Sequence, residues 1–258
     1  TDSGGTDVLN ASMVTTGLRL DLAPGGASKI DGTSLTISSL TQIENAIGGD
    51  GDDYISGSAI ANELWGMRGN DQIFGLTGSD NIYGGDGNDT LNGGDGDDTL
   101  TGGAGSDLLD GGTGLDIAAY ASTASGTRVT KESTTSWLAF EIATSSTDRL
   151  VNVERLFFND GALALDIHGN GGVAAKIVGA VFGKKAIWDK AKVGAVLRDL
   201  DAGMSYDLAA AVAITNAMGA NKTSSGIVGQ VYLNVAGAAA PESALQYYAA
   251  LLDEGKKT

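Results

Sequence analysis

Acidic residues recur every nine positions between residues 48 and 119. With Gly48 as position one of the first nonapeptide, position six is Asp in seven of eight consecutive copies and Asn62 in the other. The aspartates are Asp53, Asp71, Asp80, Asp89, Asp98, Asp107 and Asp116. Carboxylates at a fixed spacing suit a divalent cation, and calcium fits best because it accepts about 6–8 oxygen ligands in flexible geometry. Magnesium fits less well, since it needs a tighter octahedron and keeps more of its water.

Glycines accompany each aspartate in the same register. Residues 84–101 read GGDGNDTLNGGDGDDTLT, so positions one, two and four are glycine in the regular copies. Glycine permits positive φ and sharp turns, and small residues leave backbone carbonyls free to point at a ligand. We therefore include the glycines at positions two and four as candidate metal ligands through their carbonyls. They are Gly49, Gly51, Gly69, Gly78, Gly85, Gly87, Gly94, Gly96, Gly103, Gly105, Gly112 and Gly114.

Large aliphatic residues mark the elements that must position these loops. Position eight is Ile or Leu in seven of the eight copies, from Ile55 to Leu109, and Ala118 in the last. We predict a strand over positions seven to nine that buries only the position-eight side chain. One such unit cannot cover its own apolar face, so the units must stack. Stacked aspartates would then repel one another unless positive charge lay between them.

The eight phased copies resemble the RTX, or hemolysin-type calcium-binding, repeat family, whose signature is GGxGxDxUx. This resemblance implies a right-handed parallel β-roll with two nonapeptides in each turn, so that loops on one edge lie 18 residues apart. It also implies that each ion sits between consecutive loops of one edge, held by both position-six aspartates and by glycine-region carbonyls. The Asn62 copy, GSAIANELW, departs from the pattern, and we count five sites without it. The five implied pairs are Asp53/Asp71, Asp71/Asp89, Asp89/Asp107, Asp80/Asp98 and Asp98/Asp116.

The charge distribution agrees with bound cations. The whole chain carries a formal charge of −16. Residues 48–119 hold 14 acidic residues against one basic residue, Arg68, which gives −13. Five divalent ions would add ten positive charges to that stretch. An acidic field of this kind repels nucleic acid and anionic membranes, so we expect neither as a partner.

Other site chemistries find little support in the sequence. The chain has no Cys and a single His, His168, which excludes thiolate metal sites and the two-histidine zinc motif. An EF-hand starting at Asp95 fails, because Leu100 stands where glycine is needed and Ser106 where glutamate is needed. A flexible linker is disfavoured by the regular aliphatic residues. We expect no enzyme within this chain; any catalytic domain would lie outside it. No run of 18 apolar residues and no signal peptide are found.

The flanks predict a mainly β fold with an added α-helical region. We divide the chain into an N-terminal β capping segment (1–47), the β-roll (48–119), a C-terminal β capping segment (120–168) and a small helical bundle (169–258). The stretch IENAIGG and its surroundings resemble the C-terminal half of serralysin-type secreted metalloproteases, and DRLVNVERLFFNDGALALDI resembles the closing segment of type I secreted proteins. We interpret its bulky residues as a plug for the roll, not a ligand site. Helices are predicted over 173–184, 188–202, 205–218, 223–236 and 241–254. This region resembles a helical domain of unknown role that often follows RTX repeats.

These resemblances imply a calcium-binding module of a bacterial protein that is exported through type I secretion machinery and folds on calcium outside the cell or at its surface. One alternative is the tail of a surface-layer protein or adhesin, in which calcium serves assembly and the helical region contacts a neighbouring surface protein or a cell-surface glycan. A third possibility is the C-terminal region of a secreted hydrolase with its catalytic domain upstream.

Overall fold

The computed structural model describes residues 5–38, 42–166, 181–182, 190–218 and 230–231, together with single residues 174, 177, 223, 227, 242, 246 and 249. The chain forms two compact units, Thr1–Leu165 and Asp166–Thr258. The first unit takes in the predicted N-terminal β capping segment, the β-roll and the predicted C-terminal β capping segment as far as Leu165. Each unit is described separately below.

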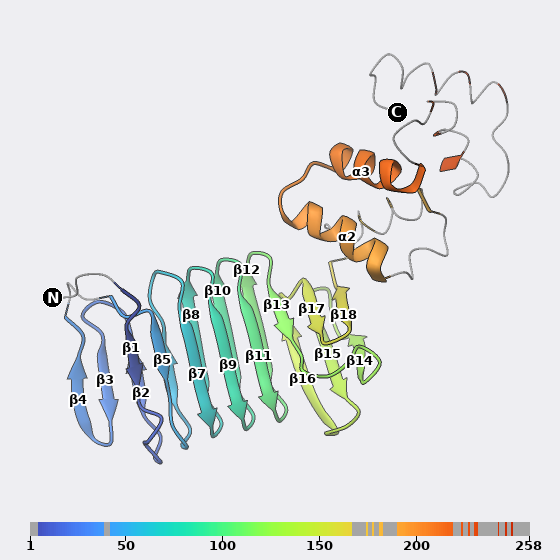
Figure 1. Cartoon of the computed structure of the whole chain (residues 1–258). Coiled ribbons are helices and arrows are strands. Elements are labelled where there is room, and N and C mark those ends of the chain that lie inside the picture. The colour runs from blue at the N-terminus through green and yellow to red at the C-terminus, as the bar shows by residue number, and fades with distance from the viewer. Residues whose placement is uncertain are drawn as a thin grey trace. The chain divides into compact units, whose positions relative to one another are not determined.

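The first unit consists of two long sheets whose strands stack along one axis (Figure 1). Sheet A has the order β1-β5-β7-β9-β11-β13-β17-β18 and sheet B the order β14-β15-β16-β12-β10-β8-β6-β2-β3-β4. The strands of sheet A are β1 (Val8–Asn10), β5 (Asn45–Ile47), β7 (Glu63–Arg68), β9 (Asn81–Asp86), β11 (Thr99–Ala104), β13 (Ile117–Ala119), β17 (Arg155–Phe158) and β18 (Gly161–Ala164). The strands of sheet B are β2 (Arg19–Asp21), β3 (Ala27–Ile30), β4 (Thr33–Thr36), β6 (Tyr54–Ser56), β8 (Gln72–Thr77), β10 (Thr90–Asp95), β12 (Leu108–Thr113), β14 (Thr127–Lys131), β15 (Ser136–Glu141) and β16 (Ser146–Val151).

Successive nonapeptides alternate between the two sheets. Thr90 in β10 pairs in parallel with Gln72 on one side and with Leu108 on the other, each 18 residues away. Sheet A keeps the same spacing, with Thr99 between Asn81 and Ile117. Two nonapeptides therefore make one coil, and the predicted parallel β-solenoid is confirmed.

Position eight forms the core of the solenoid. Ala118 and all seven Ile or Leu residues at this position are fully buried between the two sheets. These seven are Ile55, Leu64, Ile73, Ile82, Leu91, Leu100 and Leu109. Because each side chain packs against its counterparts in neighbouring coils, the apolar ladder runs the whole length of the repeat.

The strands are longer than the predicted three residues in most coils. Strands β7 to β12 have six residues and continue from positions seven to nine into positions one to three. The position-one glycine is buried inside each of these strands. A Cβ atom on Gly84 would clash with Oδ2 of Asp89 and come within 2.6 Å of the Gly102 carbonyl oxygen. Glycine at position one is thus needed for space, and the strand passes straight through it.

Both flanks of the repeat add coils that lack the glycine loops. At the N-terminal end, β1 pairs with β5 and β2 with β6, both in parallel. At the C-terminal end, β17 pairs in parallel with β13, and β16 with β12. Antiparallel strands then close the stack: β3 and β4 at the beginning of sheet B, β15 and β14 at its end, and β18 at the end of sheet A. The parallel stack therefore ends in short antiparallel strands on both flanks, and the capping role of the flanks stays a prediction.

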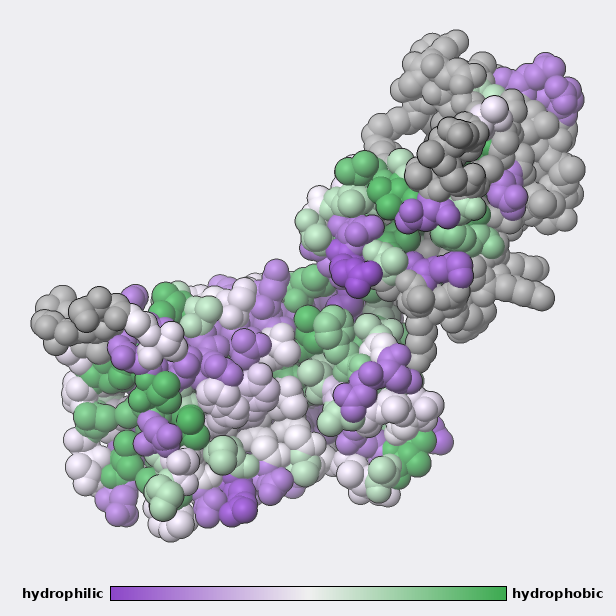
Figure 2. Space-filling model, in the orientation of Figure 1, coloured by the Kyte–Doolittle hydropathy of each residue, from purple (hydrophilic) through white to green (hydrophobic). Residues whose placement is uncertain are grey.

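The outer surface of the solenoid is polar over its middle coils. Figure 2 shows hydrophilic and weakly coloured residues across the visible face of these coils. Positions seven and nine of β10 are Thr90 and Asn92, which flank the buried Leu91. The alternation of buried and outward residues therefore follows the period of two expected for a strand with one apolar face.

The second unit contains two described helices, α2 (Lys190–Asp201) and α3 (Tyr206–Met218). They confirm the helices predicted over 188–202 and 205–218. Gly203 lies between them with φ of +84°, where glycine commonly ends a helix. Most of the predicted helices 173–184, 223–236 and 241–254, and also His168, lie outside the described residues. Among the described residues, no helix is long and apolar enough to cross a membrane.

Truncating a position-eight side chain tests the apolar ladder. We expect Leu91→Ala to lower the free energy of unfolding by about 2–5 kcal/mol in excess calcium, because the buried cavity cannot be refilled by rigid neighbouring coils. Leu91→Met should cost less than about 1.5 kcal/mol, since the volume is kept. Denaturant unfolding in calcium measures both values. Equal costs for the two variants would contradict a tightly packed ladder.

Candidate metal centre

Two rows of loops connect the sheets. We call edge 1 the row that runs from sheet A to sheet B, with loops starting at Gly48, Gly66, Gly84 and Gly102. Edge 2 is the row that runs from sheet B to sheet A, with loops starting at Gly57, Gly75, Gly93 and Gly111. The position-six residues follow these glycines at the end of each loop, directly before the next strand. The parallel register therefore places loops 18 residues apart next to each other on the same edge.

The position-six aspartates form a hydrogen-bonded ladder along each edge. Oδ1 of each aspartate accepts the backbone N–H of the position-six residue in the preceding coil. On edge 1 the N–H groups of Asp53, Asp71 and Asp89 each donate to the following aspartate at 2.8 Å. On edge 2 the corresponding N···Oδ1 distances are 2.7 Å for Asn62–Asp80, 2.8 Å for Asp80–Asp98 and 2.9 Å for Asp98–Asp116. The structure thus brings together all five predicted pairs of aspartates.

The second oxygen of six of these carboxylates is buried without a hydrogen-bond partner. The six residues are at most 3% exposed, and no described residue donates to their Oδ2 atoms. They are Asp71, Asp89 and Asp107 on edge 1 and Asp80, Asp98 and Asp116 on edge 2. A buried acceptor without a donor costs about 1–3 kcal/mol, and more when it is charged. Six repeated costs of this kind indicate that another group satisfies these oxygens.

Backbone carbonyls converge on the same points. A Cβ atom built on Gly66 would clash with Asp71 Oδ2 and lie 2.6 Å from the carbonyl oxygen of Gly84 in the next coil. Gly75 has the same surroundings on edge 2, with Asp80 Oδ2 and the Gly93 carbonyl. Each cradle therefore collects oxygen acceptors only, which is the ligand set that calcium prefers. The residues fit a calcium ion, although the carbonyls found here are those of position one.

The predicted glycines at positions two and four shape the loops. Gly69, Gly78, Gly85, Gly87, Gly94, Gly96, Gly103, Gly105, Gly112 and Gly114 all have positive φ, between +98° and +142°. Two of the three position-two residues that are not glycine are also left-handed, Met67 (φ 87°) and Leu76 (φ 82°), whereas Ser58 in the irregular copy is not. Gly49 and Gly51 do not share this conformation; a Cβ there would clash with the backbone of Val14 and of Gly17 respectively. The second glycine of each pair makes the turn, and the first gives room.

The N-terminal end of each ladder is closed by hydrogen-bond donors. Asp53 Oδ2 accepts the Gly49 N–H at 2.8 Å, and its Oδ1 accepts the Leu18 N–H at 3.0 Å. Asn62 donates from Nδ2 to the Glu44 carbonyl at 2.8 Å. A donor therefore occupies the Asn62 end of edge 2, in agreement with leaving that copy out of the predicted sites.

Burial raises the pKa values of the position-six aspartates. Desolvation by burial raises the pKa of Asp71, Asp80 and Asp116 to about 7. The hydrogen bonds that these carboxylates accept from backbone N–H groups act in the opposite direction but are the smaller effect. The same cause raises the pKa of Asp89, Asp98 and Asp107 to about 6. Neighbouring carboxylates add to the rise, as Asp98 does for Asp80. Charged carboxylates are thus unfavourable here without a counter-charge.

Two acidic residues outside the repeat extend the ladders and were not among the predicted site residues. Asp148 Oδ1 accepts the Asp107 N–H at 3.0 Å on edge 1, and Glu154 Oε2 accepts the Asp116 N–H at 2.9 Å on edge 2. Each precedes a fully buried leucine by two residues, the same spacing as positions six and eight of the repeat. That spacing is the sequence signal that could have found them. The closing segment therefore contributes polar groups to the ladders as well as its apolar plug.

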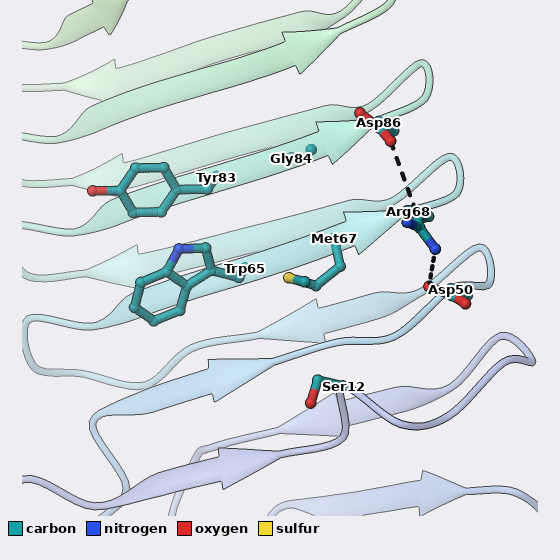
Figure 3. A pocket seen from close by; sticks show the side chains of 9 residues that line it. Ser12, Asp50, Trp65, Met67, Arg68, Tyr83, Gly84 and Asp86 are labelled. Carbon is teal, nitrogen blue, oxygen red and sulfur yellow. Dashed lines mark hydrogen bonds and ion pairs between the residues drawn. The ribbon is translucent and has the colours of Figure 1, made fainter.

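A shallow pocket of about 460 Å³ lies on the outer face of sheet A and does not include the position-six aspartates (Figure 3). Trp65 and Tyr83 stack there with ring centroids 5.4 Å apart. Arg68 lies between Asp50 and Asp86, at 3.3 Å and 3.9 Å, with its side chain 68% exposed. Exposed pairs of this kind contribute little to stability, so Arg68 does not neutralise the buried carboxylates.

Comparison with known families bears on this ladder. Residues 47–82 and 83–118 match the family model of the RTX calcium-binding nonapeptide repeat, each match spanning four copies. The chain thus contains RTX calcium-binding repeats, folded as a parallel β-solenoid. The comparison with curated proteins gave no match. The serralysin resemblance of the flanks and the identity of the helical region stay predictions.

The raised pKa values predict the effect of pH on the calcium-free protein. Between about pH 4 and pH 7 the folded ladder binds more protons than the unfolded chain, whose aspartates titrate near 3.8, so stability falls as pH rises. We expect more β structure at about pH 5 than at about pH 8 without calcium. Far-ultraviolet circular dichroism in the presence of a chelator measures this. Excess calcium should remove the difference at about pH 8, and a calcium-free protein more ordered at the higher pH would contradict the argument.

Proposed function

We propose that this chain is the calcium-binding module of a bacterial type I secreted protein, and that it folds when it meets calcium outside the cell. The observation that carries the proposal is the set of six buried, unpartnered carboxylate oxygens at the repeat loops. Typical RTX repeat proteins are secreted, which supports the export route. The role proposed is binding and folding, not catalysis.

Without calcium, the ladders oppose folding. Residues 48–119 carry a formal charge of −13, and coil stacking brings the position-six carboxylates into adjacent buried positions. Removing such charges from water without a partner costs several kcal/mol each. The calcium-free repeat would therefore remain expanded at neutral pH, a state suited to passage through a narrow secretion channel.

With calcium, the same residues become ligands. The position-six aspartates and the carbonyls of the glycine loops would hold the ions, which supply the positive charge that the cradles lack. Because neighbouring coils share each site, the site does not exist in the unfolded chain, and the free energy of binding becomes free energy of folding. Sites of extracellular modules work at about 10⁻⁴–10⁻³ M calcium, which suits a switch between the inside and outside of a cell.

Chelation should separate the two units. Without calcium we expect residues 48–119 to unfold, because their carboxylates lose their counter-charge, while helical structure in residues 190–218 persists. The region from 120 to 258 has 13 acidic and 13 basic residues and so carries no comparable repulsion. Circular dichroism and amide hydrogen exchange with and without calcium measure this. An equally protected repeat after exhaustive chelation would contradict the proposed switch.

A shared ladder predicts that one substitution damages two sites. Asp89 lies between Asp71 and Asp107, so Asp89→Ala should reduce the number of bound calcium ions by more than one. The matched control is Asp86→Ala, which removes the same charge from the same loop at a side chain that is 72% exposed. Isothermal titration and metal analysis of the saturated protein give the counts. Loss of a single ion would contradict sharing.

The same two variants test export. In cells with a type I secretion system, Asp89→Ala should lower the amount of folded, protease-resistant protein in the medium, whereas Asp86→Ala should not. Equal yields would separate calcium binding from export and remove the secretion part of the proposal. Calcium-dependent sheets or fibres of the unmodified protein would instead favour the surface-layer alternative.

A further inference from the structure

Edge 1 does not end at the last nonapeptide. Asp107 donates its N–H to Asp148 Oδ1 at 3.0 Å, and the Arg149 N–H donates to the Asp107 carbonyl at 2.8 Å. The inner coils are joined by the same two bonds, such as those that Asp89 and Leu108 make at 2.8 Å. Asp148 therefore takes a position-six place in the coil that follows, although it lies 41 residues from Asp107 instead of 18.

This last pair of carboxylates lacks a counter-charge. Asp107 is 3% exposed and Asp148 is 4% exposed. Oδ2 of Asp107 has no hydrogen-bond partner among the described residues, and neither carboxylate forms an ion pair with any of them. Two adjacent buried carboxylates in this state would repel each other strongly. The pair shares the aspartate-to-backbone hydrogen bond of the inner coils, with one aspartate supplied from outside the repeat.

The Tyr120 side chain lies beside Asp148 at the end of edge 1. A Cβ atom on Gly102 has only atoms of Asp107 as its three nearest neighbours, whereas in inner loops the next coil's carbonyl lies 2.6 Å from the same point. The Tyr120 hydroxyl is buried and interacts with the Asp148 side chain. Its oxygen is a further candidate ligand at this end of the edge, beside the carboxylates of Asp107 and Asp148.

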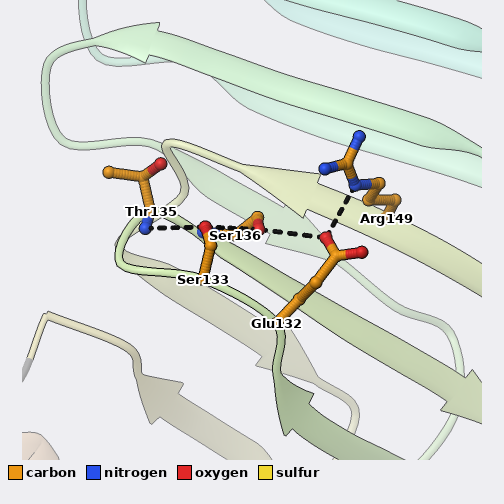
Figure 4. Close-up of polar contacts among 5 residues, drawn as sticks. All are labelled: Glu132, Ser133, Thr135, Ser136 and Arg149. Atoms are coloured by element: carbon orange, nitrogen blue, oxygen red, sulfur yellow. Dashed lines mark hydrogen bonds and ion pairs between the residues drawn. The ribbon is translucent and has the colours of Figure 1, made fainter.

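The basic residue that follows Asp148 in the sequence pairs with another carboxylate. Arg149 follows Asp148 but points to the outer face, where its Nε donates to Glu132 Oε2 at 2.7 Å (Figure 4). Ser136 donates to the same oxygen at 3.0 Å. Glu132 therefore links the hairpin β14–β15 to Arg149 on β16. The Arg149–Glu132 contact holds the strand that carries Asp148, and it keeps the positive charge of Arg149 on the outer face. Edge 2 differs, because the buried Arg155 donates to the Glu154 carbonyl at 2.9 Å and places a positive charge beside that ladder's end.

We propose that Asp107, Asp148 and the Tyr120 hydroxyl form a further calcium site that closes edge 1. This inference rests on the proposed function of the repeat as a calcium-binding module. It adds one ion beyond those of the repeat and makes the closing β segment part of the calcium-dependent fold. The segment then locks onto the roll through the metal as well as through its apolar residues.

Metal analysis of the calcium-saturated full chain tests the site. Asp148→Asn keeps the oxygen that accepts the Asp107 N–H but removes the charge, so the count should fall by one ion relative to the unmodified protein. Asp86→Asn, which removes one charge from an exposed side chain of an edge 1 loop, should leave the count unchanged. Circular dichroism in calcium would show that both variants are folded.

Terbium provides a second measurement that does not depend on the folding of the Asp148 variant. Terbium replaces calcium in oxygen sites, and its emission is excited through tyrosine rings in direct proximity. Tyr120→Phe should lower this emission, whereas Tyr83→Phe, on the outer face of sheet A, should lower it much less. An unchanged calcium count in Asp148→Asn, or unchanged emission in Tyr120→Phe, overturns the assignment. If the unmodified protein bound no calcium at all, the proposed function itself would fail, and this outcome is distinct.

Discussion

Buried carboxylate oxygens that face only other acceptors are the constraint on which this solenoid depends. Each inner aspartate uses one oxygen to receive the N–H of the preceding coil, which fixes the spacing between loops. Its other oxygen is then directed toward the carbonyl of the next coil, where no donor stands. The hydrogen-bonded register and the cation cradle are thus two consequences of the same side chain. If the register formed without a cation, the cost of burying the unpartnered carboxylate oxygens would remain.

Magnitudes explain why the apolar core alone does not decide the outcome. The seven large aliphatic residues at position eight contribute about 1.5–3 kcal/mol each when buried. Six carboxylate oxygens without donors cost about 1–3 kcal/mol each, and more as charges. The two sets are of the same order, and the glycine-rich loops add a large loss of backbone entropy on folding. The buried aliphatic residues therefore do not outweigh these opposing costs by a wide margin.

The repeat itself could be predicted because its phase never slips, whereas its ends could not. Asp53 to Asp116 recur in one register, and that register is sufficient to assign neighbours in space. The sequence alone could not show why position one must be glycine, because Gly84 and Asp89 come into contact only in the folded loop. Asp148 was hidden by the hairpin inserted before it, which breaks the spacing of 18. Only its distance to the following buried Leu150 preserves the pattern.

The two ends of edge 1 are chemically different, and this gives the stack a direction. At the first coil, Asp53 has donors on both oxygens, from Leu18 and Gly49, so its carboxylate is satisfied within the protein. At the last coil, Asp107 keeps an unpartnered side-chain oxygen, and its backbone N–H donates to a further carboxylate, that of Asp148. Each inner aspartate contacts its neighbours on both sides, so an ion bound in one cradle positions a ligand of the next, as in other linear repeats coupled between nearest neighbours. Order can then spread along the edge from the hydrogen-bonded end, while the end at Asp107 remains dependent on positive charge from outside the chain.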